Sequence, residues 1–296
     1  MKVDLRIIVD KKRTADFNMA ADLYLLEQCR EKDTVFIRFY SWQRPSVTIG
    51  YMQNPSGLLN FRTLKEKKGQ WIRRPTGGRA VLHENDITYS CIFSKRVKPM
   101  GDSIAQTYRI ITDCLMDGLK RAQIDCDAHD SYDELREVGR DVKLPCFLAP
   151  NRDEIMVKKR KLVGSAQKRV LNGVLQHGSI PLCDAYTELP NLLNIPEVDK
   201  DRQIRLLKRK GTYIREWVPD ATFESIVECL IRGFTSKLPW PAQISPWSSE
   251  EQKRIQKLAG SEEFQGKWMA IEETESSSAL QSPPPFSPSR TEQESA

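Results

Sequence analysis

Histidine is scarce in this chain, with 3 residues among 296, and none of its 7 cysteines stands in a CxxC pair. Because a zinc site needs several such ligands at close spacing, the sequence predicts no metal site. The chain also lacks the GKS or GKT ending of a Walker loop and lacks a GxGxxG motif, which excludes two common phosphate-binding loops. No apolar run is long enough to span a membrane, and residues 1–6 hold no apolar core of signal-peptide length, so we expect no membrane segment.

Composition and charge are those of a soluble globular protein, with 39% hydrophobic and 29% charged residues. The cysteines are odd in number and scattered, which indicates a reducing compartment, and we expect a cytoplasmic protein. A net charge of +6 is typical of an ordinary solvated surface. A weaker inference is attraction to acidic partners, which include carrier proteins as well as nucleic acids. Since the chain has no nucleic-acid-binding signature, we expect no nucleic-acid partner.

Hydrophobic periodicity divides the chain into strands and helices. We expect strands at residues 5–9, 34–40, 46–49, 87–93 and 175–182, the last turning at Gly178. We expect helices at residues 16–29, 58–68, 103–122, 223–234 and 248–260, with Asp16 and Ser103 capping the first and third. The apolar stripe of the third helix is Ile104, Tyr108, Ile111, Leu115 and Leu119.

The order of these elements predicts the fold class. Strands are often adjacent and helices are few, which favours an α/β or α+β domain on a mixed sheet over a doubly wound fold. The segment from about residue 272 is rich in serine and proline and predicts a disordered tail at 272–296 after a single domain at 1–271.

The segment 146–167 is the first candidate for chemistry. It begins at Cys146, and two short strands around a basic turn would bring Lys161 back toward its start. A lysine ammonium beside a thiol favours the nucleophilic thiolate. Gly164, Ser165 and Ala166 are expected to follow the second of these strands and carry little side-chain bulk, so a ligand can approach their backbone. The alternative interpretation is a structural cysteine, because most free cysteines are small buried apolar residues.

A glycine pair beside three arginines is the second candidate. Arg73, Arg74, Gly77, Gly78 and Arg79 suggest a loop whose backbone approaches an anionic or extended ligand. A plain turn with solvated arginines is the alternative that such a loop by itself favours.

Two further features stay open at this point. His177 could be catalytic, although a structural histidine is the more usual outcome. Residues 197–211 are strongly charged, which favours a solvated helix face and leaves the docking of an acidic partner as the alternative.

Several short motifs, taken in order, resemble the biotin/lipoate protein ligase superfamily. They are FNMAAD at 17–22, PSVTIG at 45–50, RRPTGGRAVLH at 73–83, KLVGSAQ at 161–167 and QHGS at 176–179. Within the superfamily, the chain most resembles the cysteine-dependent octanoyltransferases that load lipoyl domains in bacteria of the Gram-positive type. The features that carry this resemblance are Gly-Gly-Arg at 77–79 and Cys146-Phe147 with Ala149-Pro150 ahead of the lysine motif.

The resemblance implies a ligase-type catalytic domain with a mixed sheet and flanking helices, working without a cofactor or a metal. The donor would be octanoyl-acyl carrier protein, and the acceptor would be a lysine of a lipoyl-domain protein such as the glycine cleavage H protein. Cys146 would carry the octanoyl group as a thioester, and Lys161 would lower the pKa of its thiol.

The resemblance also implies the residues that bind the substrate. The glycine loop and the 164–166 segment are candidates for the donors that stabilise the oxyanion. The implied binding residues are Arg73, Arg74, Gly77, Gly78, Arg79, His83, Gly164, Ser165 and Ala166.

Three other functions compete with this one. An ATP-dependent lipoate or octanoate ligase could use the same scaffold, with Lys161 on an acyl-adenylate and Cys146 a bystander. An amidotransferase could move octanoyl between lipoyl domains through a cysteine. A basic, non-enzymatic nucleic-acid-binding module is the alternative from a different class.

Overall fold

The computed structural model describes residues 3–29, 32–129 and 154–270 of the chain. Two of the sequence predictions lie outside these residues. They are the expected nucleophile Cys146 and the expected tail at 272–296.

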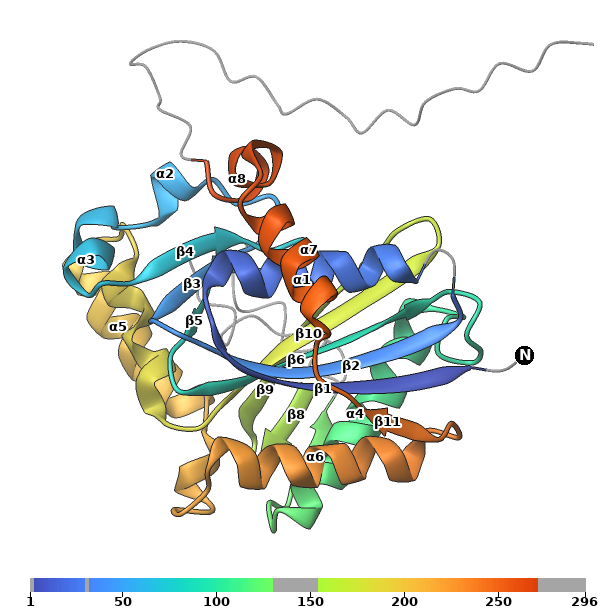
Figure 1. Ribbon diagram of the computed structural model, residues 1–296. Coiled ribbons are helices and arrows are strands. Elements are labelled where there is room, and N and C mark those ends of the chain that lie inside the picture. Colours follow the sequence, from blue (N-terminus) through green and yellow to red (C-terminus); the bar gives the residue numbers. More distant parts are fainter. Residues whose placement is uncertain (1–2, 30–31, 130–153, 271–296) are drawn as a thin grey trace, which may run out of the picture.

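A mixed eight-stranded sheet is the centre of the fold, in the order β11-β1-β2-β6-β10-β9-β8-β7 (Figure 1). β1 pairs in parallel with β2 and β11, and the other neighbours in this sheet are antiparallel. The expectation of a mixed sheet is therefore confirmed. The strands are β1 (Asp4–Arg13), β2 (Thr34–Trp42), β3 (Ser46–Ile49), β4 (Gln70–Arg73), β5 (Val81–His83), β6 (Asp86–Ser94), β7 (Asp127–His129), β8 (Glu154–Val157), β9 (Arg160–Arg169), β10 (Gly173–Pro181) and β11 (Ala242–Ile244).

Helices cover both faces of this sheet. In Figure 1, α1 and α7 lie over one face, and α4 and α6 lie under the other. The central strands β6 and β10 are buried along their whole length, as strands covered on both sides must be. The helices are α1 (Ala15–Gln28), α2 (Pro55–Leu58), α3 (Phe61–Glu66), α4 (Ile104–Arg121), α5 (Glu197–Lys210), α6 (Phe223–Lys237), α7 (Ser249–Ala259) and α8 (Glu262–Trp268), with the 3-10 helices η3 (Asp184–Leu192) and η4 (Ile214–Glu216).

A second, three-stranded sheet holds the glycine loop. Its order is β4-β3-β5, and it packs its own apolar cluster against α2, α3 and η3. The connection from β4 to β5 is the stretch that contains Gly77 and Gly78. The small sheet carries this loop to the central strand β10 of the large one, where Thr76 Oγ1 lies 2.7 Å from His177 Nε2.

Local side-chain chemistry explains most of the helix boundaries. The Ser103 side chain accepts a hydrogen bond from the Gln106 amide and begins α4, as the sequence predicts. Ser248 and Glu251 form a reciprocal capping box at α7. No helix in the described part of the chain is long and apolar enough to cross a membrane.

Five local expectations are wrong. α1 begins after Thr14, so Asp16 lies within its first turn and does not cap it. The expected helix at 58–68 is two short helices, α2 and α3, because Asn54 and Asn60 each cap a separate start. Ile104 is 56% exposed, since the first turn of α4 extends past the core.

The other two corrections concern strands at the site. The segment 164–166 does not follow a strand but lies inside β9, which continues to Arg169. β10 runs straight through Gly178 without turning, because the ladders to β6 and β9 hold it on both sides.

The turn between β8 and β9 has an unusual composition. Lys158 and Lys159 are its only two residues, and both have positive φ, of 47° and 63°. Such a two-residue hairpin turn favours Asn-Gly, because a side chain in the left-handed region meets its own backbone. Both lysines are exposed, and the contact of Lys158 Nζ with the Trp217 ring, 5.0 Å from its centroid, offsets only part of the strain of two left-handed side chains.

Replacing this turn should stabilise the protein. We expect Lys158→Asn with Lys159→Gly to raise the free energy of unfolding by about 1 kcal/mol, since each left-handed L-residue costs roughly that much. Urea denaturation should show a higher midpoint at an unchanged slope. The matched control, Lys158→Val, should lower the midpoint, because a β-branched residue is poorly tolerated at positive φ. Equal midpoints for the three proteins would contradict the prediction.

Candidate active site

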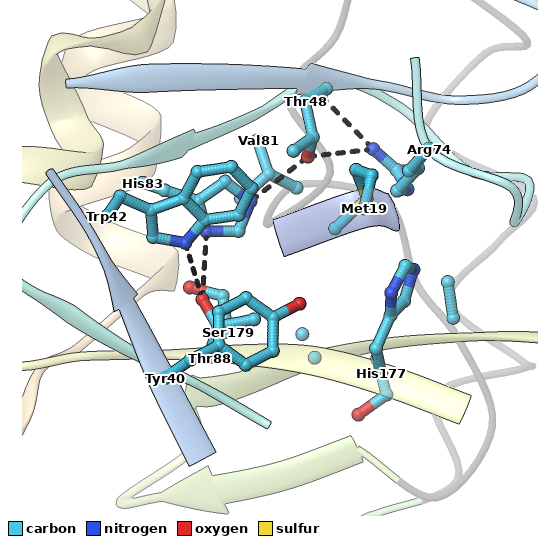
Figure 2. A pocket seen from close by; sticks show the side chains of 14 residues that line it. Met19, Tyr40, Trp42, Thr48, Arg74, Val81, His83, Thr88, His177 and Ser179 are labelled. Carbon is cyan, nitrogen blue, oxygen red and sulfur yellow. Dashed lines mark hydrogen bonds between the residues drawn. The ribbon is translucent and has the colours of Figure 1, made fainter. Parts of the chain in front are cut away.

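A pocket lies between the small sheet and strands β2, β6, β9 and β10 of the large sheet, with about 380 Å³ of empty space that includes its opening to solvent. Figure 2 shows the aromatic rings of Tyr40 and Trp42 on one side and His177 on the other. The lining residues are Met19, Tyr40, Trp42, Thr48, Arg74, Val81, His83, Thr88, Gly164, Ser165, Ala166, His177, Gly178 and Ser179.

Arg74 fixes the shape of the glycine loop. Its guanidinium is buried and donates to the carbonyl oxygens of Gly77 and Arg79, each at 2.8 Å, and to that of Thr48 at 3.1 Å. A planar guanidinium can satisfy several carbonyls at once because its donors form a rigid fork. The arginine therefore holds its own loop closed and is not a solvated surface charge.

Two glycines let this loop lie against β3. A Cβ built on Gly50 would lie 2.0 Å from the carbonyl oxygen of Gly78, closer than real atoms approach. Gly78 itself has φ of 95°, in the region that favours glycine. The close approach of these two backbones thus requires glycine on both sides.

A buried hydrogen-bond chain joins the glycine loop to the large sheet. Arg74 Nε donates to Thr76 Oγ1 at 3.2 Å, and Thr76 Oγ1 lies 2.7 Å from His177 Nε2. The other ring nitrogen, Nδ1, is 3.4 Å from Asp22 Oδ2. With Nδ1 protonated, every group in the chain is satisfied, because Thr76 then donates to Nε2 and accepts from Arg74.

The hydrogen-bond chain of Thr76, His177 and Asp22 resembles a hydroxyl–imidazole–carboxylate triad in geometry only. Thr76 is fully buried, and its oxygen already accepts from Arg74. A nucleophile must reach its substrate, so the chain is better suited to positioning the loop than to attack.

Burial determines the charge of His177. It lowers the pKa of His177, against the hydrogen bond and the charge of Asp22, which raise it. Burial also opposes ionisation of Asp22, but hydrogen bonds and the Arg38 charge together lower the pKa of that carboxyl. Arg38 Nη1 lies 3.1 Å from Asp22 Oδ1, so we assign an ionised Asp22, paired with Arg38, beside a neutral imidazole.

His83 forms the opposite wall of the pocket. Its ring stacks on Trp42, with centroids 4.3 Å apart, and its Nε2 is 3.0 Å from Thr48 Oγ1. Its Nδ1 is 2.8 Å from Asp86 Oδ2, which also accepts from Ser179. These contacts fix the orientation of the His83 ring at the wall of the pocket.

The 164–166 segment forms the third side. Among the described residues, the ladder from β8 reaches Val163 of β9, and the next three residues line the pocket. On the other side of β9, a Cβ on Gly178 would lie 2.6 Å from the Gly164 carbonyl oxygen. The two strands therefore bring backbone, not side chains, to this side of the pocket.

Lys161 does not line the pocket. It is 4% exposed, and its Nζ lies 2.5 Å from the equally buried carboxylate of Glu154 on β8. A buried ammonium needs such a partner, because desolvation otherwise disfavours the charged form. The strand places Lys161 three residues before Gly164, adjacent to the lining but outside it.

The predicted binding residues divide into two groups. Arg74, His83, Gly164, Ser165 and Ala166 line the pocket. The other four support the loop or lie beside it. Arg73 donates to the carbonyl oxygens of Tyr51 and Gln53, and Gly77, Gly78 and Arg79 form the loop that Arg74 holds.

The sequence interpretation did not single out the aromatic wall. Tyr40 and Trp42 are two residues apart on β2, so they point to the same face, and this alternation was a usable signal. Met19 and Thr48 lie inside motifs that carried the family resemblance, but nothing in their type indicates a ligand. Within residues 3–29, 32–129 and 154–270, no group of three or more His, Cys, Asp or Glu side chains is placed to hold a metal ion.

The sheet order, the glycine loop and the pocket together define a lipoyl-ligase type of catalytic domain. The chain belongs to the lipoyl protein ligase A/B catalytic domain family, whose model matches residues 14–235. The family resemblance in the sequence is thereby confirmed.

Two of the proteins most similar to this chain in sequence are octanoyltransferases. The octanoyltransferase LipM of Bacillus cereus is 36% identical over 262 residues, which cover 85% of this chain and 92% of that protein. LipM of Bacillus subtilis is 32% identical over 270 residues, which cover 89% of this chain and 96% of that protein.

Solved structures confirm the fold. A lipoate-protein ligase A bound with ATP matches with a TM-score of 0.67 at 21% identity, covering 88% of this chain and 94% of that one. A bipartite lipoate protein ligase from Thermoplasma acidophilum matches with a TM-score of 0.69 at 20% identity, covering 89% of this chain and 96% of that one. At these identities the likeness defines the architecture and not the reaction.

The contact between Gly50 and Gly78 can be tested by adding one methyl group. We expect Gly50→Ala to lower the free energy of unfolding by about 1–3 kcal/mol, because the Cβ must displace loop backbone. Gly57→Ala in α2 is the matched control, since nothing lies within 4 Å of its Cβ. Thermal unfolding should separate the two variants; equal melting temperatures would show that the loop is not held against β3.

The neutral state of His177 predicts a pH dependence of stability. Its folded pKa is depressed, so the unfolded chain binds the extra proton, and stability present above about pH 6.5 is lost as the pH falls. We expect the free energy of unfolding to fall as the pH is lowered below about 6.5. Urea denaturation across this range should show a smaller decrease in His177→Asn. An identical decrease in both proteins would mean that His177 does not titrate in this window.

Proposed function

We propose that this protein transfers an octanoyl group from an octanoyl thioester to a lysine amine of a lipoyl domain, by way of a thioester on Cys146. The observation that carries the proposal is the identity of 36% to an octanoyltransferase along 92% of that protein's length. The pocket supports it, because aromatic and backbone walls suit an unbranched apolar chain. The donor we propose is octanoyl-acyl carrier protein, and the place is the cytoplasm.

In the first step, the Cys146 thiolate attacks the carbonyl carbon of the donor thioester. The tetrahedral intermediate collapses, the bond to the donor sulfur breaks, and the donor leaves as a thiol after it takes up a proton. A thioester is already activated, so this step needs no ATP. One difficult transfer thereby becomes two easier ones.

In the second step, the acceptor lysine attacks the acyl-enzyme as a neutral amine. The octanoyl carbonyl becomes an amide, the lysine nitrogen loses a proton, and the Cys146 thiol is regenerated. The acceptor we propose is a lipoyl-domain protein such as the glycine cleavage H protein.

Lys161 is the residue we propose to favour the thiolate. An ammonium near a thiol stabilises the negative form. Glu154 keeps this ammonium paired within the protein, and its carboxylate offsets part of the positive field. The pair therefore supplies a fixed dipole whose positive end belongs to Lys161.

The remaining predicted residues would bind the acyl group. We propose that backbone N–H groups of the Gly77–Gly78 loop and of residues 164–166 stabilise the oxyanion, because such donors are preorganised by strand and loop geometry. Arg74 would act on the oxyanion indirectly, by holding the loop. His83, stacked on Trp42, would border the acyl chain.

The decisive experiment uses intact mass spectrometry. After incubation with octanoyl-acyl carrier protein and no ATP, we expect a hydroxylamine-labile octanoyl adduct that maps to Cys146. Cys146→Ala should form no adduct and should lose at least about a thousandfold in transfer rate, as expected for removal of a nucleophile.

Three controls define what would contradict the proposal. Cys183→Ala, a described cysteine outside the pocket, should keep both adduct and activity. Transfer that requires ATP and survives in Cys146→Ala would indicate a lipoate ligase. Transfer from octanoylated H protein but not from the carrier protein would indicate an amidotransferase.

A further inference from the structure

Two basic segments meet beside the start of β9. The backbone N–H of Thr212, just after α5, donates to the carbonyl oxygen of Lys161 at 3.0 Å, and Gly211 bridges to Lys161 as a parallel partner. This contact places the end of α5 next to the β8–β9 turn. We call the exposed side chains of Lys158, Lys159, Lys208 and Arg209 the basic edge.

The acidic side chains of this region are paired with other cations, and Lys158 and Lys208 of the basic edge also lower the pKa of Glu216 and Glu188. Glu216 forms an ion pair with Arg160, and Glu188 forms one with Lys67. The acidic residues of α5 are confined to its beginning, at Glu197, Asp199 and Asp201 (Figure 1 shows α5 at the left edge of the molecule). A net positive field therefore remains at the end of α5 that borders β9.

Stability does not explain both segments. Cations in the last turn of a helix are favourable, and this accounts for Lys208 and Arg209. It does not account for two lysines at left-handed positions that favour Asn-Gly, although Lys158 Nζ lies 5.0 Å from the centroid of the Trp217 ring, a cation–π contact that offsets part of the strain. A local rule broken at an exposed, charged turn points to a role in function.

We propose that the basic edge is the docking surface for the acyl donor, an acidic carrier protein that presents its thioester on a long flexible arm. The inference rests on the proposed octanoyl transfer and adds the surface that selects the donor. Charge complementarity of this kind raises the rate of encounter and fixes the orientation of the partner.

The distance from the basic edge to the pocket favours the donor over the acceptor as the protein that docks there. From Arg160 to Ser165, β9 spans roughly 16 Å, at ~3.3 Å per residue. An acceptor lysine side chain is too short to cross that distance, so an acceptor must dock over the pocket itself. A pantetheine arm is several times longer than a lysine side chain, and it can deliver a thioester along β9 from a protein bound at the basic edge.

The test compares two donors at low salt. We expect Lys208→Glu with Arg209→Glu to lower kcat/KM for octanoyl-acyl carrier protein about tenfold or more, and the difference should shrink at high salt. For octanoyl-pantetheine, which is small and uncharged, kcat/KM should stay within about twofold, as should kcat/KM for the lipoyl domain. The matched control is Lys253→Glu with Lys257→Glu on α7, which packs on α1, and it should behave as wild type.

A second variant separates docking from folding. Lys158→Asn with Lys159→Gly should raise the melting temperature and yet lower kcat/KM for the carrier-borne donor several-fold. If the variant is more stable, and its activity falls with the protein donor but not with octanoyl-pantetheine, it has lost an interaction surface and not its fold.

Direct binding distinguishes failure of this inference from failure of the proposed function. Fluorescence anisotropy should show that labelled carrier protein binds the wild type and loses affinity about tenfold for the Lys208 and Arg209 double variant. Unchanged affinity and unchanged donor kinetics in that variant would overturn the docking surface while transfer continues. A loss confined to the lipoyl domain would overturn it in favour of the acceptor. A wild type that binds the carrier through this edge but transfers nothing would support the docking surface and overturn the proposed reaction.

Discussion

The buried carboxylate of Asp22 is the interaction on which the rest of the site depends. It comes from α1 and bonds to Arg38 and Tyr40 on β2, to Ser90 on β6 and to His177 on β10. Burying a carboxylate costs several kcal/mol, and only several simultaneous charged and hydroxyl donors offset that cost. The same carboxylate therefore fixes the position of α1 over the central strands.

The polar chain extends from Asp22 into the small sheet through His177, Thr76 and Arg74. Each of these links satisfies a buried polar group, so the hydrogen bonds of Arg74 and Thr76 favour one arrangement of the glycine loop. Arg74 and His177 of this polar frame also line the pocket, beside the aromatic rings of Tyr40 and Trp42 and the backbone of residues 164–166. Such a site can hold backbone donors in place and still accommodate an apolar chain.

The beginning and the middle of β9 serve different purposes. Its first residues carry the buried pair of Lys161 with Glu154 and border the basic edge, and its middle residues line the pocket. One continuous strand thus connects the surface proposed for donor docking with the walls proposed for acyl binding. Because the ladder to β10 fixes β9 along residues 164–169, the distance between the two is set by strand geometry and not by a loop.

The sequence by itself determined the family, the mixed sheet, most element positions and the two backbone segments of the site, because periodicity, capping residues and glycines act locally. It could not determine that Arg74 turns inward, that His177 is tied to Asp22 through contact of residues 155 positions apart, or that Lys161 is paired with Glu154. The sequence also left open whether the charged stretch at 197–211 lies beside a second basic segment. Those outcomes follow from which strands become neighbours, and long-range pairing is decided only when the whole core packs.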